Sequence, residues 1–330
     1  MILTITLNPS LDVVYQTATF KIGATNRELN HRTVVGGKGV NAARVSSILA
    51  GKTSGRISAT GFIGKKNSDL ILDELKNFNI NNEFVPIDGK TRYCYTILDE
   101  EGTKTELNEI GEPISQGSLE KLLTIIDKMA DLTAVSINGS VPAGLPTDTY
   151  RQILKHVKAH NPEAQVILDS SGAAFSAALQ SAELPDIIKP NSDELGQLLN
   201  QEIPESPIET LRALQDDRLK GIPAVVVSLG HQGAALKIGT DVPHFYFVKT
   251  RLLREVNAEG SGDAVVGGML YAIDQGLDLL TVIKYGMAAG MANVMEAKTG
   301  FVNPENVSAY VEDDSQIIFQ EVNRTDLSMN

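Results

Sequence analysis

The chain has 330 residues and a formal net charge of -12, which argues against nucleic acid or an anionic membrane surface as a general partner. A single cysteine, Cys94, excludes an internal disulfide and fits a reducing compartment. The sequence shows neither an export signal at its N-terminus nor an apolar run of roughly twenty residues, the length of a membrane span. We therefore expect a cytoplasmic protein that binds neither nucleic acid nor membrane.

Predicted strands and helices alternate along the chain, which is typical of a parallel sheet covered by helices on both faces. β-type apolar runs predict strands at 2–7, 134–137, 166–169, 186–188 and 224–228. Leu, Ile and Val at spacings of three and four residues predict helices at 118–130, 147–160, 192–200 and 208–215. Most polar motifs follow the ends of predicted strands, where open α/β sheets bind their ligands.

Two segments break this alternation. Residues 13–35 and 92–107 are rich in Thr, Tyr, Val and Ile, and the second contains a turn at 99–102, so we expect hairpins of a small second sheet. An exposed apolar face on such a sheet needs cover. No internal repeat or long linker divides the chain, and we expect one domain over residues 1–322 followed by a frayed tail at 323–330.

The run Gly260-Ser261-Gly262-Asp263 leads into an apolar predicted helix. Its glycines can turn several backbone N–H groups toward one anion, and the helix adds its positive end. The carboxylate of Asp263 would repel a phosphate, but it can take a proton from a hydroxyl that attacks a phosphoryl group. The alternative is that Asp263 only caps the helix.

A second glycine cluster, Gly36-Gly37-Lys38-Gly39-Val40-Asn41, also opens a predicted helix and carries a cation. Two such turns suggest two phosphates. The pattern from Gly37 to Ala42 also fits a loose dinucleotide fingerprint, which would indicate an oxidoreductase, but residues 51–61 contain no acidic residue for the ribose. Residues 61–66 have the wrong glycine spacing for a Walker loop.

Taken in order, these motifs resemble the PfkB sugar kinase family of the ribokinase-like group, over nearly the whole chain. The early and late signatures are Gly36 to Asn41 and Gly260 to Asp263, with 138–146 and 189–194 between them. Residues 8–12, Thr91-Arg92 and 298–303 look like the branch that phosphorylates ketohexose monophosphates, which comprises tagatose-6-phosphate kinases and 1-phosphofructokinases. The tail from Tyr285 is more similar to the tagatose-6-phosphate kinases.

The resemblance implies a ribokinase-like three-layer α/β fold with a mainly parallel central sheet, and a small β-sheet that acts as a lid over the sugar. In several members this lid also forms a homodimer contact. The implied reaction transfers the γ-phosphoryl group of ATP, with Mg²⁺, to tagatose 6-phosphate, giving the 1,6-bisphosphate; fructose 1-phosphate is the alternative acceptor. A non-catalytic sugar-phosphate sensor is a competing interpretation. Asp263 beside Gly260 and Gly262 argues against it, because a sensor needs no base.

The resemblance also assigns roles to residues. Asp263 is the expected base, and the N–H groups of Gly260, Ser261 and Gly262 are expected to hold the developing charge. Around the sugar phosphate we expect Asp12, Arg27, Gly37, Lys38, Gly39, Asn41, Arg92, Asn108 and Ser140. In this group Lys38 and Arg92, with Arg27, are the cations expected to hold the phosphate already present, since a guanidinium suits phosphate oxygens.

For the nucleotide, the resemblance implies contacts from Lys189, Asn191, Glu194, Ser228, Gly230, Gly233 and Asn293, the last near the adenine. Asn191 and Glu194 form an Asn-x-x-Glu pair that organises magnesium, with Glu194 acting through water because Mg²⁺ keeps several of its waters. Helix capping is the alternative for Asn191.

One pair departs from the pattern of the branch. Ala258-Glu259 stands where Pro-Val is common. The extra carboxylate could attract a cation, face solvent or weaken anion binding, and it leaves open whether a monovalent cation is needed.

Overall fold

Parallel strands form the centre of the protein. The computed structural model describes residues 1–51, 55–204 and 206–327, and within these residues eleven strands join in one sheet, in the order β15-β14-β13-β12-β11-β10-β9-β1-β4-β5, with β6 paired to β4. Neighbours from β5 to β12 are parallel, whereas β13, β14 and β15 run antiparallel. The strands are β1 (Ile2–Thr6), β4 (Ile57–Gly64), β5 (Asn81–Asn82), β6 (Val85–Ile87), β9 (Ala134–Asn138), β10 (Gln165–Asp169), β11 (Ile187–Ile188), β12 (Ala224–Ser228), β13 (Ala234–Ile238), β14 (His244–Thr250) and β15 (Ile317–Val322).

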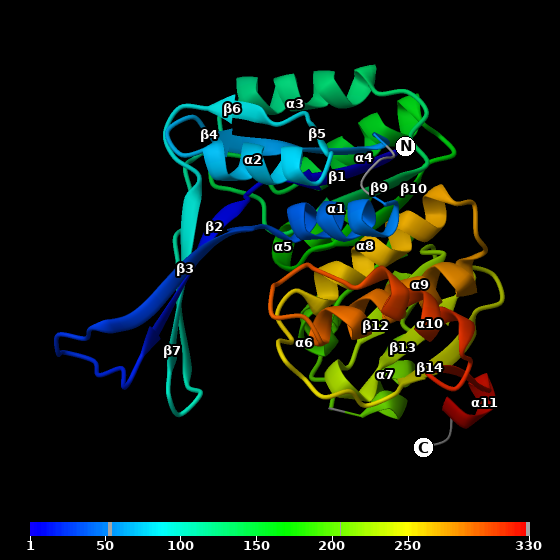
Figure 1. The fold of residues 1–330 in the computed structure, drawn as a ribbon. Helices are drawn as coiled ribbons and strands as arrows, with labels where there is room; N and C mark the ends of the chain where they lie inside the picture. Colours follow the sequence, from blue (N-terminus) through cyan, green and yellow to red (C-terminus); the bar gives the residue numbers. More distant parts are fainter. Residues whose placement is uncertain (52–54, 205, 328–330) are drawn as a thin grey trace.

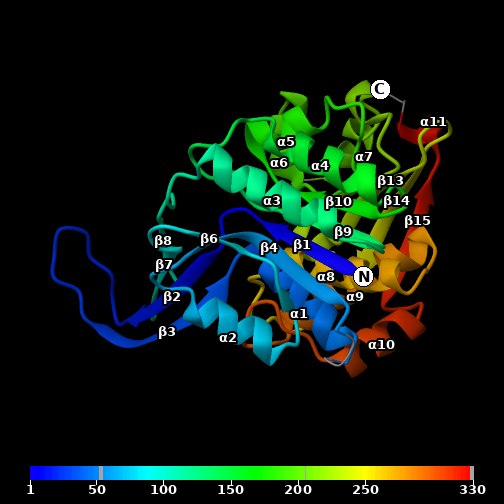
Figure 2. The ribbon, with the colours of Figure 1, turned by 90° about the horizontal axis from the view of Figure 1, so that it is seen from above.

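Helices cover both faces of this sheet, so that three layers result (Figure 2). One face carries α1 (Lys38–Leu49), α2 (Asp69–Asn77), α8 (Ser261–Asp274), α9 (Leu279–Val294) and α10 (Pro304–Glu312). The other carries α3 (Gln116–Lys128), α4 (Thr149–His160), α5 (Gly172–Ala178), α6 (Ser192–Leu199) and α7 (Pro207–Ala213). Across the described residues, none of the helices combines the length and the apolar character of a membrane span.

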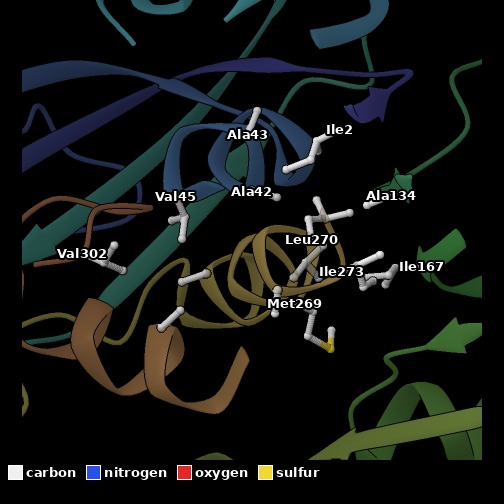
Figure 3. Close-up of a cluster of buried hydrophobic side chains, with 14 of the residues drawn as sticks. Ile2, Ala42, Ala43, Val45, Ala134, Ile167, Met269, Leu270, Ile273 and Val302 are labelled. Atoms are coloured by element: carbon white, nitrogen blue, oxygen red, sulfur yellow. The ribbon is translucent and has the colours of Figure 1, made fainter. Parts of the chain in front are cut away.

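Two hydrophobic cores result because successive residues of a strand point to opposite faces. Ile2 of β1 belongs to the core under α1 and α8, whereas its neighbour Leu3 belongs to the core under α3 and α4. In the first core, Ile2 and Ile167 from the sheet lie near Leu270 of α8 (Figure 3). Burial on both faces explains why the predicted strands are nearly continuous apolar runs.

Helices α1 and α8 approach each other unusually closely. A Cβ atom at Gly267 of α8 would lie 2.7 Å from the Ala42 carbonyl oxygen and from Val45 Cβ of α1. A side chain at this position would therefore push the helices apart. The contact places the N-terminal ends of both helices at the same edge of the sheet.

The second sheet projects from the body (Figure 1). Its strands lie in the order β3-β2-β7-β8, where β2 (Ser10–Thr17) and β3 (Glu28–Gly36) form one antiparallel pair and β7 (Arg92–Asp99) and β8 (Lys104–Asn108) another. Strands β2 and β7 are parallel. The predicted α/β fold, with a mainly parallel sheet between helices and a second small sheet, is confirmed.

The expected frayed tail does not begin at residue 323. Residues Arg324–Leu327 form the short helix α11. The Leu327 side chain is 3% exposed and belongs to the core under α3 and α4, so apolar burial orders this segment. Residues 328–330 of the predicted tail lie outside the described part of the chain.

Asp274, at the C-terminal end of α8, gives a test of the fold. Its carboxylate accepts hydrogen bonds from Arg56 Nη2 at 2.9 Å and from Thr133 Oγ1. Burial alone raises the Asp274 pKa, but these hydrogen bonds outweigh burial and hold it well below its usual range. A depressed carboxyl pKa means that the ionised form stabilises the fold above pH about 4, and that this contribution is lost progressively at lower pH.

We predict that Asp274→Asn lowers the free energy of unfolding at pH 7 by about 1–3 kcal/mol, since hydrogen bonds to a charged group are lost. Urea denaturation at pH 7 and pH 3 measures this. The difference from wild type should shrink at pH 3, because Asp274 is then mostly protonated in the unfolded chain but still ionised in the fold, so that unfolding takes up a proton and becomes more favourable. An equal difference at both pH values would contradict this role of the carboxylate.

Candidate active site

Two helix N-termini open at the carboxyl edge of the parallel strands. Gly37 precedes α1 with φ of +110°, and Gly260 precedes α8 with φ of +78°, angles that residues with a Cβ rarely adopt. Space also demands glycine, since a Cβ at Gly260 would lie 2.4 Å from Thr299 Cγ2. The first turns of both helices lie together, since Asn41 of α1 bonds to Asp263 of α8, and the free N–H groups of helix starts can hold anions.

Asp263 lies in the first turn of α8, and its carboxylate bonds to α1 rather than to its own helix. Asn41 Nδ2 donates a hydrogen bond to Asp263 Oδ2 at 2.8 Å, and no side chain caps α8. The capping alternative is therefore wrong. Burial, and next the nearby Asp169 carboxylate, raise the Asp263 pKa to about 6, although Asn41 and two lysines oppose the shift. A carboxyl group that titrates near neutral pH suits a general base.

Asp169, at the end of β10, is a site residue that the sequence interpretation did not assign. Its side chain is 1% exposed. Its Oδ1 accepts a hydrogen bond from Lys38 Nζ at 3.1 Å and lies 3.6 Å from Lys189 Nζ, while its Oδ2 has no hydrogen-bond partner within the described chain. The available signal was its place as the last residue of the strand predicted at 166–169, at the edge where such sheets bind ligands.

Lys38 lies among carboxylates at this centre. Burial lowers its pKa, but Asp169, Asp263 and Glu194 outweigh burial and raise the pKa above its usual value, so that the ammonium stays charged. Arg92, which we expected beside Lys38, instead donates to the carbonyl oxygens of Asn8 and Glu109, both at 3.2 Å. The two predicted cations therefore have different partners.

Asp12 marks the side of the site nearest the small sheet. A Cβ at Gly36 would lie 2.1 Å from Asp12 Oδ2, so only glycine leaves room for this carboxylate. Ser10 Oγ donates to Asp12 Oδ1 at 2.6 Å, and burial raises the Asp12 pKa despite this bond. Strands β2 and β7 place Ser10 opposite Arg92 in register. Asp12 and Arg92 therefore face one region at the base of the small sheet.

Of the other residues predicted around the sugar phosphate, some lie near Asp12 and Lys38 and others lie apart from them. Gly39 packs against β1, where a Cβ would lie 2.3 Å from Thr6 Oγ1. Ser140 is exposed and lies 3.5 Å from Asn8 Nδ2, and Asn108 is exposed at the end of β8. Arg27 is not brought to this group, because it lines a separate cavity on the small sheet with Tyr15, Thr17, Phe20, Asn26, Glu28 and Ile97.

A cavity of about 280 Å³ lies beside the start of α8. It is lined by Lys189, Ser228, Gly230 and Gly233, which we predicted for the nucleotide, and by Ser261 and Gly262 of the glycine turn. Its apolar wall includes Val226, Val265, Met287, Met291 and Val294. A Cβ at Gly262 would lie 3.3 Å from Lys189 Nζ, so this lysine lies between the cavity and the carboxylates.

Asn293, which we predicted near an adenine, is not among the residues that line this cavity. Its side chain is buried and donates to the carbonyl oxygens of Lys298 and Phe301, at 3.4 and 3.0 Å. Its neighbours Met291 and Val294 line the cavity instead. On a helix, residues so close in sequence point in different directions, and Asn293 faces the 298–301 loop.

Asn191 and Glu194 form a capping box on α6. Asn191 Oδ1 accepts from the Glu194 N–H at 2.8 Å, and Glu194 Oε2 accepts from the Asn191 N–H at 2.9 Å. The capping alternative for Asn191 is confirmed. The Glu194 carboxylate still acts on Lys38, whose pKa it helps to raise. Among the described residues, no group of three or more His, Cys, Asp or Glu side chains is placed to hold a metal ion by itself.

Glu259, the residue that departs from the branch pattern, forms an ion pair with a lysine of the small sheet. Its Oε1 lies 2.9 Å from Nζ of Lys104, a residue of β8 in the small sheet. Because Glu259 directly precedes Gly260, this ion pair joins the small sheet to the turn that opens α8. The carboxylate also contributes, after burial, to raising the Asp12 pKa.

Comparison with known proteins identifies the family. The profile described as pfkB family carbohydrate kinase matches residues 7–306. Three solved structures are similar over almost their whole length: a candidate phosphofructokinase from Staphylococcus aureus (30% identity, TM-score 0.76, 98% of this chain and 99% of that one), phosphofructokinase-2 from Escherichia coli with potassium (25%, 0.83, 94% and 99%) and ribokinase from Thermotoga maritima (18%, 0.75, 95% and 99%). The last of these shows the fold alone, which is ribokinase-like. Since the profile spans most of the sequence, the chain belongs to the pfkB family of carbohydrate kinases.

Proposed function

We propose that this kinase transfers the γ-phosphoryl group of ATP to a hydroxyl of a ketohexose monophosphate. The observation that carries the proposal is the position of Asp263. Its carboxyl group, with a pKa raised to about 6, follows directly on Ser261 and Gly262, which line the cavity, and it accepts a hydrogen bond from Asn41 of α1, the helix that begins beside the region of Asp12. A base between two binding regions is what transfer from one ligand to the other requires.

The nucleotide occupies the cavity in this proposal. The adenine packs against the apolar wall that includes Met287 and Val265, and the phosphates point toward Lys189 and the start of α8. The sugar lies under the small sheet, where the Asp12 carboxylate accepts hydrogen bonds from its hydroxyls.

Asp263 then takes the proton of the attacking hydroxyl. The hydroxyl oxygen forms a bond to the γ-phosphorus, the bond from phosphorus to the β-γ bridging oxygen breaks, and ADP leaves. The N–H groups of Gly260, Ser261 and Gly262, with the positive end of α8, hold the charge on the transferred group. Lys38 and Lys189 add positive charge beside them.

Mg²⁺ fits the carboxylates at this centre. Asp169 offers the buried oxygen Oδ2 without a hydrogen-bond partner in the described chain, and Glu194 lies near Lys38. These two residues would hold the ion, in part through water. When bound, Mg²⁺ neutralises charge on the transferred and leaving phosphates. The potassium complex of the related Escherichia coli phosphofructokinase-2 supports a monovalent cation as an additional activator.

Among acceptors we favour tagatose 6-phosphate, on the resemblance of the tail from Tyr285, with fructose 1-phosphate as the alternative. The similarity to phosphofructokinases supports a phosphorylated ketohexose. ADP release from ATP and magnesium with a panel of free and phosphorylated hexoses tests this choice. A protein that binds a sugar phosphate but releases no ADP with any of them would be the non-catalytic sensor.

We also propose that two copies pair through the small sheet, which then acts as a lid. Its strands and connections leave large apolar side chains in solvent, including Ile22, Leu29 and Leu107, which are 97%, 64% and 69% exposed. A second lid would cover this apolar surface. Arg27, on the connection that ends at β3, could then contribute to the phosphate site of the partner subunit.

The first prediction for catalysis concerns Asp263. Asp263→Asn should lower kcat by about 10²- to 10⁴-fold, the usual contribution of a general base, and leave nucleotide affinity largely unchanged. In the wild type, kcat should rise with pH through about 6, because only the ionised carboxylate accepts a proton; the variant should lack this limb. Near wild-type turnover in Asp263→Asn would remove the assignment.

The second prediction concerns recognition of the phosphate on the sugar. Arg92→Ala should raise the KM for the phosphosugar much more than the KM for ATP, because the guanidinium would contact a group whose charge does not change in the reaction. Free hexoses should be poor substrates. Lys90→Ala is a matched control, since Lys90 is a neighbouring exposed cation paired with Glu109. An Arg92→Ala variant impaired only toward ATP would contradict this role.

A further inference from the structure

Arg44 is a buried cation directly behind the reacting groups, and no role has been assigned to it above. It lies on α1, one turn after Asn41, and its side chain is 2% exposed. Its guanidinium makes hydrogen bonds on all three nitrogens, to Asn41, Glu74, and the carbonyl oxygens of Val35 and Thr299. The network therefore joins α1 to α2, to β3 and to the 298–301 loop.

The contact with Asn41 fixes the orientation of its amide. Arg44 Nη1 donates to Asn41 Oδ1 at 2.8 Å, and Asn41 Nδ2 donates to Asp263 Oδ2 at 2.8 Å. If the amide were reversed, its NH₂ group would face the guanidinium and its oxygen would face the carboxylate, and both hydrogen bonds would be lost. Arg44 thus selects the orientation in which Asn41 donates to the base.

The contact with Thr299 supports the glycine turn. Arg44 Nη1 also donates to the Thr299 carbonyl oxygen at 3.1 Å. The same loop packs on Gly260, where a Cβ would lie 2.4 Å from Thr299 Cγ2 and 3.0 Å from the Gly300 nitrogen. Arg44 therefore contacts both the partner of the base and the loop behind the groups that hold the phosphoryl charge.

Burying this cation is costly, and the protein compensates for it. Burial lowers the Arg44 pKa, while the Glu74 carboxylate raises it in return. The guanidinium also lies over the Phe301 ring, at 5.0 Å from its centroid. An apolar residue would be cheaper to bury at such a position. The forked geometry of arginine, which bonds several groups at once, explains its presence here.

We infer that Arg44 is a positioning residue for phosphoryl transfer, which orients Asn41 toward Asp263 and holds the 298–301 loop against the glycine turn. The inference rests on the proposed function, because it assigns a reaction to Asp263. In this role Arg44 needs the branched geometry of the guanidinium, which bonds several groups at once, and not only its positive charge.

Arg44→Met and Arg44→Lys test it. Both variants should lower kcat by about 10²-fold, the scale of an error in positioning, and should change the KM for ATP much less. The acid limb of kcat should move to higher pH in both, since loss of the Asn41 hydrogen bond raises the Asp263 pKa. Recovery of wild-type kcat and pH profile in Arg44→Lys would overturn positioning, because lysine keeps the charge and loses the fork.

A double-mutant cycle separates action through Asn41 from general damage. Asn41→Ala combined with Arg44→Met should lower kcat little further than Asn41→Ala alone, and fully additive effects would contradict the inference. Glu74→Gln, which keeps an acceptor for Arg44 Nε, gives a milder variant for the case that Arg44→Met fails to fold; it should retain the pH profile of the wild type, and a shifted acid limb would contradict geometric positioning.

Lys237→Met is the matched control for loss of a buried cation. Lys237 is also 2% exposed, but it lies on β13 and donates to the Ile222 carbonyl oxygen. The kcat of Lys237→Met should equal that of the wild type. A loss of about 10²-fold in this variant would contradict the inference, because loss of any buried cation would then have the same effect. A wild type without turnover on any sugar phosphate would contradict the proposed function, whereas an active wild type with unaffected Arg44 variants would contradict only the inference.

Discussion

The close crossing of α1 and α8 is the constraint on which the site depends. The helices meet where Gly267 leaves no room for a side chain, so their backbones approach nearly to contact. This distance brings Asn41 within 2.8 Å of Asp263 although 222 positions separate them in the chain. The same crossing brings the glycine turns before α1 and α8 to one edge of the sheet, and helix N-termini of this kind can hold anions. A larger residue at this point would push the helices apart and lengthen the distance between Asn41 and Asp263.

Local patterns were sufficient for most of the fold. The strand at 224–228 and the glycine turns before α1 and α8 could be predicted, because a buried strand needs a short apolar run and a positive φ angle favours glycine. What could not be predicted depends on long-range pairing. The residues next to Asp169 in the sequence do not indicate that two lysines pair with its carboxylate. Those next to Asn293 do not indicate that its side chain bonds to the 298–301 loop. The contact between Arg44 and Asn41 is easier to predict from the sequence, since their spacing of three residues places both on one face of a helix.

The ion pair between Glu259 and Lys104 shows how a departure from a family pattern can be accommodated. A carboxylate beside a phosphate site is unfavourable by itself. Here Lys104, which also contacts Glu106, supplies the compensating charge from the small sheet. Both partners are partly exposed, so the pair contributes little to stability. Its effect is geometric, because it connects strand β8 of the small sheet to the glycine turn that opens α8.

The Asp169 carboxylate favours the charged form of two neighbouring lysines and disfavours the charged form of Asp263, because all three groups lie close to it. Without Asp169, the nearly buried Lys189 would lose its carboxylate partner, and burying a cation alone would be costly. The Asp169 carboxylate meets both lysines and reduces this cost. The same negative charge lies near Asp263 and helps to raise its pKa to about 6. One side chain thus pairs with two cations and also raises the pKa of the neighbouring carboxyl group toward neutral pH.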